Sequence, residues 1–308
     1  MQRQIIVLFC SLFLWFGVPF NGPLQAAEPS AAIPNRGALF KLEHGGHTAY
    51  LFGTIHVGAA DFYPLEPRVT AALQQASVLA LEIDPLGDQA AITRAVRDHG
   101  MARNGRGAVS EELSPAYRPR LQQLLRRYAI APETVAPMQP WMVASLLTIS
   151  EFVAQGYEPA LAVDAWLSRQ ARERRLRVVE LESVAGQMML FNRMSNAEQA
   201  RFLEEGIAAI EDEEQARQAR DIVHAWRHAD QAGLNEIARK AEEDDTFSGK
   251  FVQRVLLDQR NPGLASGIAS LLARERHSFA AIGVLHLVGK GNVPELLRKR
   301  GIAVERIY

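Results

Sequence analysis

Two segments of this chain have the same predicted order of strands, loop and helix, and this repeated order restricts the folds that the chain can adopt. Residues Tyr50–Asp84 have the pattern of a strand, Gly-Thr-Ile-His, a loop, a helix and a second strand. Residues Phe279–Tyr308 repeat this order with Gly-Val-Leu-His and a Gly-containing loop. His56 and His286 therefore stand where a strand leads into a loop, and ligands bind at such strand ends in open α/β sheets. If the two strands pair, both imidazoles line one crevice.

The hydropathy pattern places strands near both ends of the chain and helices between them. Strands are expected at 38–43, 48–55, 78–83, 177–181, 279–284 and 302–307, the first two joined by a turn at Gly45-Gly46. Helices are expected at 66–75, 141–154, 164–174, 251–257 and 293–300. The helical stretch 196–243 has interspersed acids and bases, which is typical of a solvated face. Asn261-Pro262 is expected to interrupt the helical run before it.

The residues at the two Gly-x-x-His strand ends have the chemistry of a metal site. Glycine inside a strand, here Gly53 and Gly283, often marks a close approach of backbone or ligand. Glu82 ends an otherwise apolar strand, where a carboxylate must be paired, bound to a ligand or solvated. With His56 and His286 it would make a metal site with open positions for water and substrate. A purely structural role remains the alternative for each histidine taken singly.

Other candidate groups are weaker. His44 and His47 flank the expected turn, and His224 and His228 lie four residues apart on a charged helix with no third ligand nearby in sequence. No Gly-x-Ser-x-Gly, P-loop or dinucleotide-binding motif is present, so serine hydrolases, NTPases and Rossmann oxidoreductases lack support. The net charge of −1 and the lack of a long basic run argue against a nucleic-acid partner.

Residues 1–27 have the pattern of a secretory signal peptide, which predicts a periplasmic or secreted protein. Arg3 is followed by the apolar run Ile5–Phe16 and then by small residues before position 28. The run is short for a membrane span, so no span is expected after cleavage, and an uncleaved anchor is the alternative. Cleavage removes Arg3 and no acidic residue, which changes the net charge from −1 to −2. It also removes Cys10, the only cysteine, so a metal site must use histidine and carboxylate.

After the signal peptide, residues 28–36 are expected to be a linker because Pro29–Asn35 is rich in proline, alanine and serine. Residues 37–308 are then long enough for one domain with a sizeable core.

Motifs in this order along residues 37–308 resemble the TraB/PrgY/GumN proteins, which include the TIKI metalloproteases. The matching segments are Leu51-Phe-Gly-Thr-Ile-His-Val-Gly58, Leu79-Ala-Leu-Glu-Ile-Asp84, Ala162-Val-Asp-Ala-Trp-Leu with Asp164, Val179-Glu-Leu-Glu-Ser183 with Glu182, Gln187, Asp258-Gln-Arg-Asn261 and Ala281-Ile-Gly-Val-Leu-His-Leu-Val-Gly289. The sequence departs from the family at Ala229-Asp230, where many members have Gly-Asp.

The resemblance implies an α/β (α+β) fold of the erythromycin-esterase and ChaN-like group, a mixed central sheet surrounded by helices with a long helical middle segment. It also implies a peptidase that depends on a divalent metal (Mn, Co or Zn) and acts on a peptide or protein. His56, His286 and Glu82 would be the metal ligands, with Glu82 alternatively the general base. Arg260 and Asn261 would orient ligands or polarise a carbonyl. A ChaN-like haem binder, or a protein that sequesters a peptide without catalysis, is the alternative.

Overall fold

The structure, a computed structural model, describes residues 33–102 and 107–308. The signal peptide expected at 1–27, with Cys10, and most of the linker expected at 28–36 lie outside these ranges. Within the described ranges, no helix combines the length and the apolar character that a membrane span needs.

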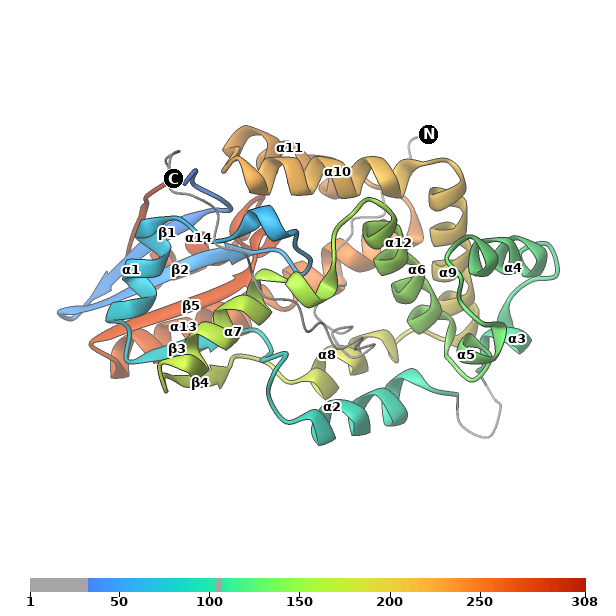
Figure 1. Ribbon diagram of the computed structural model, residues 1–308, viewed down its shortest axis with the longest axis horizontal. Helices are drawn as coiled ribbons and strands as arrows, with labels where there is room; N and C mark the ends of the chain where they lie inside the picture. The colour runs from blue at the N-terminus through green and yellow to red at the C-terminus, as the bar shows by residue number, and fades with distance from the viewer. Residues whose placement is uncertain (1–32, 103–106) are drawn as a thin grey trace.

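Six strands form one mixed sheet in the order β4-β3-β5-β2-β1-β6 (Figure 1). They are β1 (Leu39–His44), β2 (His47–Thr54), β3 (Val78–Leu81), β4 (Arg177–Glu180), β5 (His277–Gly283) and β6 (Ala303–Arg306). Strands β4, β3, β5 and β2 are parallel, whereas β1 is antiparallel to both of its neighbours. The turn between β1 and β2 uses Gly45 and Gly46 at φ 57° and 80°, a conformation that glycine adopts without steric cost. The expected hairpin is confirmed.

Strand β5 lies between β2 and β3, which brings the carboxyl ends of all three strands together. Thr54 is opposite Gly283 in the register of β2 with β5, and Leu81 is opposite Ala281 in that of β3 with β5. Strand β3 is apolar and buried throughout, and β2 and β5 are buried toward their carboxyl ends, as expected for parallel strands covered on both faces. The two Gly-x-x-His strands therefore pair directly, which is the condition for both imidazoles to line one crevice.

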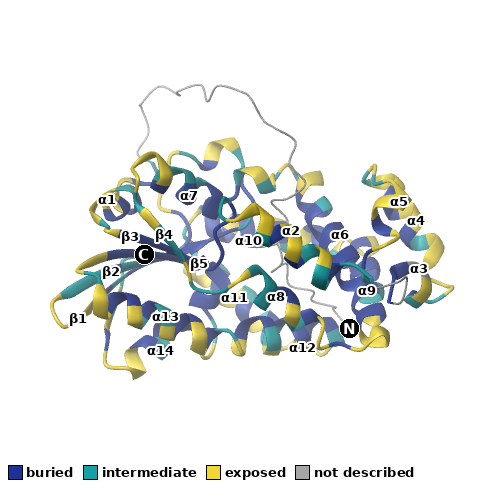
Figure 2. Cartoon of the chain, turned by 90° about the horizontal axis from the view of Figure 1, so that it is seen from below, coloured by how far each residue is buried: buried dark blue, intermediate teal, exposed yellow. Residues whose placement is uncertain are grey.

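Helices cover both faces of the sheet (Figure 2). Helices α1 (Pro67–Gln75) and α7 (Val163–Glu173) pack on one face, and α13 (Asn261–Arg274) and α14 (Val293–Lys299) on the other. Each presents apolar residues to the strands, for example Val69 and Leu73 of α1 and Leu264 and Ile268 of α13. The predicted fold class, a mixed sheet surrounded by helices, is confirmed.

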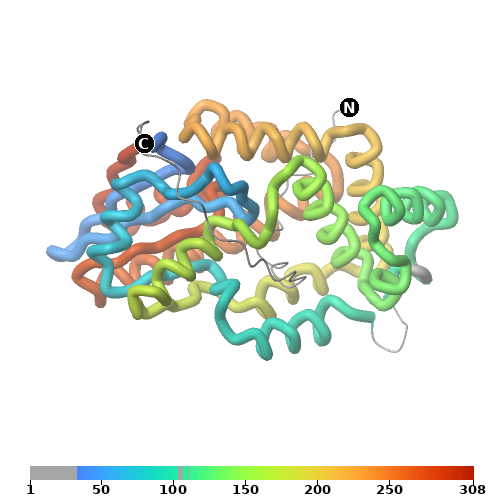
Figure 3. The backbone as a smooth tube through the Cα atoms, viewed as in Figure 1, coloured from blue at the N-terminus to red at the C-terminus, as the bar shows by residue number. Residues whose placement is uncertain are grey.

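The remaining helices form a lobe beside the carboxyl ends of the strands (Figure 3). The chain enters it after β3, returns at β4, and enters it again before β5. Its α-helices are α2 (Gln89–Ala95), α3 (Val109–Glu112), α4 (Arg118–Arg127), α5 (Pro132–Val135), α6 (Pro140–Ala154), α8 (Val184–Phe191), α9 (Asn196–Glu211), α10 (Glu214–Arg227), α11 (Gln231–Glu242) and α12 (Phe247–Phe251). The chain also forms three short 3₁₀ helices, η2 (Ala60–Phe62), η4 (Pro159–Leu161) and η6 (Val284–Leu287), among the described residues. Two π-helical segments are η3 (Val96–Gly100) and η5 (Val252–Asp258).

One expectation about this region was wrong, because the stretch 196–243 is not simply a solvated face. Its helices are amphipathic and bury Phe202, Leu203 and Trp226 against the core. The break expected at Asn261-Pro262 is confirmed, since the helical run before it ends at Asp258. The pair then begins a new helix, α13, with the proline in the first turn, where its missing N–H is not needed.

Ala229 follows α10 with a φ of 48°, a left-handed conformation that glycine favours at the ends of helices. Its position is where the sequence departs from the Gly-Asp of the family. We expect Ala229→Gly to raise the free energy of unfolding by about 0.5–1 kcal/mol, measured by urea denaturation. Ala71→Gly, at an exposed position inside α1, should lower it by about 1 kcal/mol. Destabilisation by both changes would contradict this explanation.

Glu66, just before α1, is 1% exposed and accepts a hydrogen bond from the hydroxyl of Tyr308. Burial raises the pKa of its carboxyl to about 7. The stability it contributes is therefore full below its ordinary pKa of 4.5 and is lost as the pH rises through 7. At pH 8.5 we expect the free energy of unfolding of Glu66→Gln, measured by urea denaturation, to exceed that of wild type by roughly 2 kcal/mol. At pH 4.5 we expect no such gain. A gain independent of pH would contradict the assignment.

Candidate active site

His56 lies two residues beyond β2, and its ring is fixed by an acid from another element. Its Nδ1 is 2.7 Å from Oδ2 of Asp164, which is in the first turn of α7. Both side chains are nearly buried, with 11% and 9% of their surface exposed. Burial alone would lower the pKa of His56, but the carboxylates of Asp164 and Glu82 together outweigh it and the pKa is raised. Asp164 accepts a hydrogen bond from Nδ1–H, and the Nε2 of His56 faces the site.

His286 is completely buried in η6, the short 3₁₀ turn that follows β5, and its tautomer is defined by its partner. Its Nδ1 is 2.6 Å from Oδ1 of Asn261. The amide of Asn261 donates from Nδ2 to the carbonyl of Gly291 at 3.0 Å, so Oδ1 is the acceptor and Nδ1 of His286 carries the proton. Burial lowers the pKa of His286 well below its usual range, which keeps the ring neutral. Its buried Nε2 has no hydrogen-bond partner among the described residues.

Glu82, directly after β3, brings a carboxylate between the two imidazoles. Its Oε1 accepts a hydrogen bond from the backbone N–H of Gly283 at 2.7 Å and lies 3.5 Å from Nε2 of His286. Its Oε2 accepts one from Nη2 of Arg260 at 2.9 Å. Burial alone would raise the pKa of Glu82, but the guanidinium of Arg260, the two imidazoles and the N–H of Gly283 together outweigh it, and the pKa is lowered. Glu82 is therefore an ionised carboxylate although only 4% of it is exposed.

Arg260 joins this group to a second carboxylate. Its Nε donates to Oε2 of Glu182 at 3.0 Å, and Gln187 of α8 donates to the same oxygen at 2.9 Å. Arg260 also donates to the carbonyl of Leu256 at 3.0 Å. Its guanidinium is therefore held by protein groups, so it neutralises and orients Glu82 rather than facing a substrate carbonyl freely.

The two glycines of the Gly-x-x-His motifs have different roles. A Cβ on Gly283 would lie 3.3 Å from Nε2 of His56 and 3.4 Å from Oε1 of Glu82, so the glycine leaves space where these atoms converge. A Cβ on Gly53 would lie 2.9 Å from Cγ2 of Val284, so this glycine permits the close packing of two strand ends. Only Gly283 marks an approach to the site itself.

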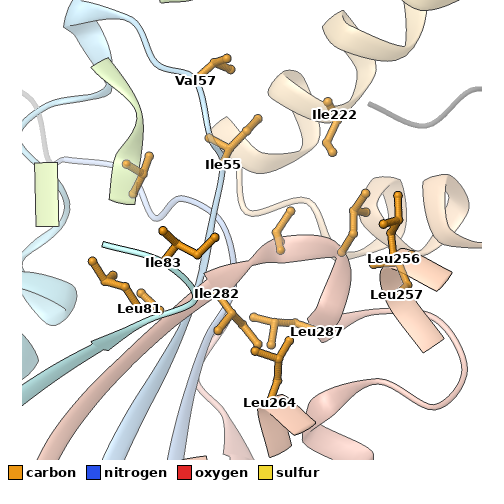
Figure 4. Close-up of a cluster of buried hydrophobic side chains, with 14 of the residues drawn as sticks. Ile55, Val57, Leu81, Ile83, Ile222, Leu256, Leu257, Leu264, Ile282 and Leu287 are labelled. Atoms are coloured by element: carbon orange, nitrogen blue, oxygen red, sulfur yellow. The ribbon is translucent and has the colours of Figure 1, made fainter. Parts of the chain in front are cut away.

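The cluster opens into a small pocket lined by Thr54, His56, Glu82, Ile83, Pro85, Asp164, Ala281 and Ile282. Apolar side chains from several elements surround these strand ends (Figure 4). They include Ile55 after β2, Ile83 after β3, Ile282 of β5 and Leu287 of η6. A low-dielectric surrounding of this kind strengthens electrostatic interactions at the site.

The charge and lone pairs of the cluster fit a bound cation. Nε2 of neutral His286 and Oε1 of ionised Glu82 are both acceptors and face each other at 3.5 Å. Glu82, Asp164 and Glu182 supply three carboxylates against one guanidinium, that of Arg260. The partners on both Nδ1 atoms are of the kind that orient metal-binding histidines. In residues 33–102 and 107–308, however, no three or more His, Cys, Asp or Glu side chains are already grouped as a metal-ion cage.

Comparison with known proteins agrees with the motifs. The TraB/PrgY/gumN family matches residues 38–306. This chain belongs to that family. It is similar to the uncharacterised protein YbaP of Shigella flexneri and to that of Escherichia coli K12, with 24% identity in each case over 82% of this chain and 89% of the relative. No solved structure matches it.

The structure brings together every catalytic and metal-binding residue that the sequence indicated, whereas Gly53 lies outside the group. His56, Glu82, His286, Arg260 and Asn261 form one contiguous group, which Asp164, Glu182 and Gln187 complete. The residues alone did not reveal that Asp164 is the partner of His56. An acid in the apolar stretch Ala162-Val-Asp-Ala-Trp was the available signal, because a buried acid requires a partner.

Two other histidine pairs do not join this group. The Nδ1 of His47 in the hairpin hydrogen-bonds to the backbone carbonyl of Leu272. The Nδ1 of His228 hydrogen-bonds to the backbone carbonyl of His224 on α10.

Proposed function

We propose that this chain is an exported, metal-dependent hydrolase that acts on peptides. The observation that carries the proposal is the unpartnered Nε2 of buried His286, which faces the ionised carboxylate of Glu82. Two acceptors at 3.5 Å repel each other unless a proton or a cation lies between them. Burial disfavours the additional proton on His286, so a cation is the better occupant.

His56, His286 and Glu82 would hold the cation, and these nitrogen and oxygen donors suit Mn²⁺, Co²⁺ or Zn²⁺. When bound, such an ion supplies Lewis acidity toward a carbonyl and lowers the pKa of a bound water. Asp164 and Asn261 fix the direction of each imidazole, and Arg260 keeps Glu82 ionised. Peptides as the substrate class, and export, rest on the family resemblance and on the pattern of residues 1–27.

The test is metal content together with peptide cleavage by the purified protein. We expect wild type to retain about one equivalent of metal after desalting from Mn²⁺, Co²⁺ or Zn²⁺, and to cleave members of a peptide library. His56→Ala and His286→Ala should lose both properties, whereas His44→Ala, in the hairpin turn, should keep them. Equal metal binding and cleavage by wild type and all three variants would contradict the proposal. Metal binding without cleavage of any peptide would favour a sequestering protein instead.

A further inference from the structure

A second hollow lies between α11, the loop after His286 and the start of α14. Its volume is about 580 Å³, it is partly open to solvent, and it shares no lining residue with the pocket at His56. We call it the α11–α14 groove. Its charged lining residues are Arg239, Lys290, Arg298 and Arg306 against Glu242 and Glu295. Basic residues therefore outnumber acidic ones in the lining itself.

Three of these lining residues, Arg239, Lys290 and Glu242, already form ion pairs. Arg239 pairs with Glu236 and Glu243 on its own helix. Lys290 pairs with Glu242 at 2.9 Å. Among the described residues, Arg298, Arg306 and Glu295 are then the lining charges without an ion pair.

Arg298 and Arg306 form no ion pair among the described residues. Arg298 is exposed and donates only to the carbonyl of Val304, at 3.2 Å. Arg306 is opposite Phe40 in the register of β6 with β1, and its guanidinium carbon lies 5.5 Å from the centre of that ring. Burial lowers the pKa of Arg306, and no carboxylate offsets this effect. Both arginines line the groove with their charges unmatched.

The unpaired atoms of Arg306 indicate the chemistry of a partner. Its Nε and Nη2 are buried and have no hydrogen-bond partner in the described part of the chain, so the side chain must turn toward the groove to offer them to a ligand. These two N–H groups form one edge of the guanidinium, which a carboxylate or phosphate takes with two parallel hydrogen bonds. Buried donors in native proteins are nearly always satisfied by protein, water or ligand.

We propose that the α11–α14 groove binds a small molecule bearing a carboxylate or phosphate group, which Arg306 holds and Arg298 attracts. Gln231 and Asn235 of α11 also line the groove and offer amides for the rest of the molecule. The groove wall includes residues 287–290, which begin immediately after His286. A bound anion would therefore contact the segment that carries this histidine. The proposal does not depend on hydrolase activity.

The test is the binding of inorganic phosphate and of succinate to the full chain, at constant ionic strength maintained with NaCl. We expect at least one of the two anions, at about 10 mM, to raise the unfolding temperature and to give a saturable calorimetric titration. Arg306→Gln should abolish both effects, and Arg298→Gln should weaken binding severalfold. Arg68→Gln removes the same charge from an exposed position of α1 and should bind as wild type does.

The two anions separate the possible ligands. A response to phosphate alone would assign a phosphate group, and a response to succinate alone would assign a carboxylate. No response to either, or an unchanged response in Arg306→Gln, would overturn the proposal. If Arg306→Gln does not fold, unchanged binding by Arg298→Gln would overturn it, because Arg298 is exposed and its replacement leaves the core intact. If Arg306 were only a structural cation over Phe40, its replacement would lower ligand-free stability and leave the anion response unchanged.

Discussion

Replacing Glu82 with glutamine is expected to lower kcat/KM for peptide hydrolysis by roughly a hundred- to ten-thousandfold, the range typical of a lost catalytic carboxylate. The amide has the shape of the carboxylate but no charge, and its NH₂ cannot accept a hydrogen bond, whereas Oε1 of Glu82 accepts from Gly283 and Oε2 from Arg260. The proposed metal site thereby loses a negatively charged ligand. Arg260 keeps Glu182 as a partner, so its buried guanidinium is not left unpaired.

The variant is to be compared with wild type by steady-state kinetics, metal analysis and circular dichroism. We expect its spectrum to match that of wild type and its metal content to fall. Glu43→Gln, in the exposed part of β1, makes the same chemical change away from the site and should leave kcat/KM within about threefold of wild type. A folded Glu82→Gln protein with wild-type kcat/KM would remove Glu82 from the proposed site.

The second large effect concerns Trp226 of α10. This side chain is completely buried, and its Nε1 donates to the carbonyl of Gly53 at 2.8 Å. Its ring packs on Phe52 and Phe62, with centroids 6.4 and 5.1 Å away. Trp226→Ala should lower the free energy of unfolding by about 3–5 kcal/mol, because it leaves a cavity where the helical lobe meets β2.

Urea denaturation of two further variants separates the contributions. Trp226→Phe keeps an aromatic ring but loses the hydrogen bond, and should cost about 1–3 kcal/mol. Trp166→Phe, in the half-buried stack on Tyr63, should cost less than about 1 kcal/mol. Equal losses for Trp226→Ala and Trp166→Phe would show that Trp226 does not connect the lobe to the sheet.

The local pattern was sufficient for most strands and helices. The alternation of apolar and polar residues and the apolar runs predicted β1, β2, β3, β4 and β5 to within a few residues. This succeeded because the hydropathy pattern of a strand lies in consecutive residues. The local pattern was insufficient at Asn261-Pro262, where the proline lies in the first turn of α13. A proline next to a helical run fits both the end of one helix and the start of another, and only packing decides between them.

The chemical identity of the site residues was readable in the same way. Two Gly-x-x-His strand ends and an acid after a third strand predicted His56, His286 and Glu82, and the ordered motifs added Arg260 and Asn261. Their convergence depends on β5 lying between β2 and β3, which joins strands far apart in the chain. Pairing over such distances leaves no local signal.

What the sequence by itself determined is therefore the set of chemically active residues and the elements that carry them. Only the tertiary structure decided that Asp164 orients His56, that Asn261 fixes the tautomer of His286, and that Arg260 connects Glu82 to Glu182. The physical reason is that a strand or helix is specified by its own side chains. The partner of a buried charge, in contrast, is determined by whichever element the fold packs against it.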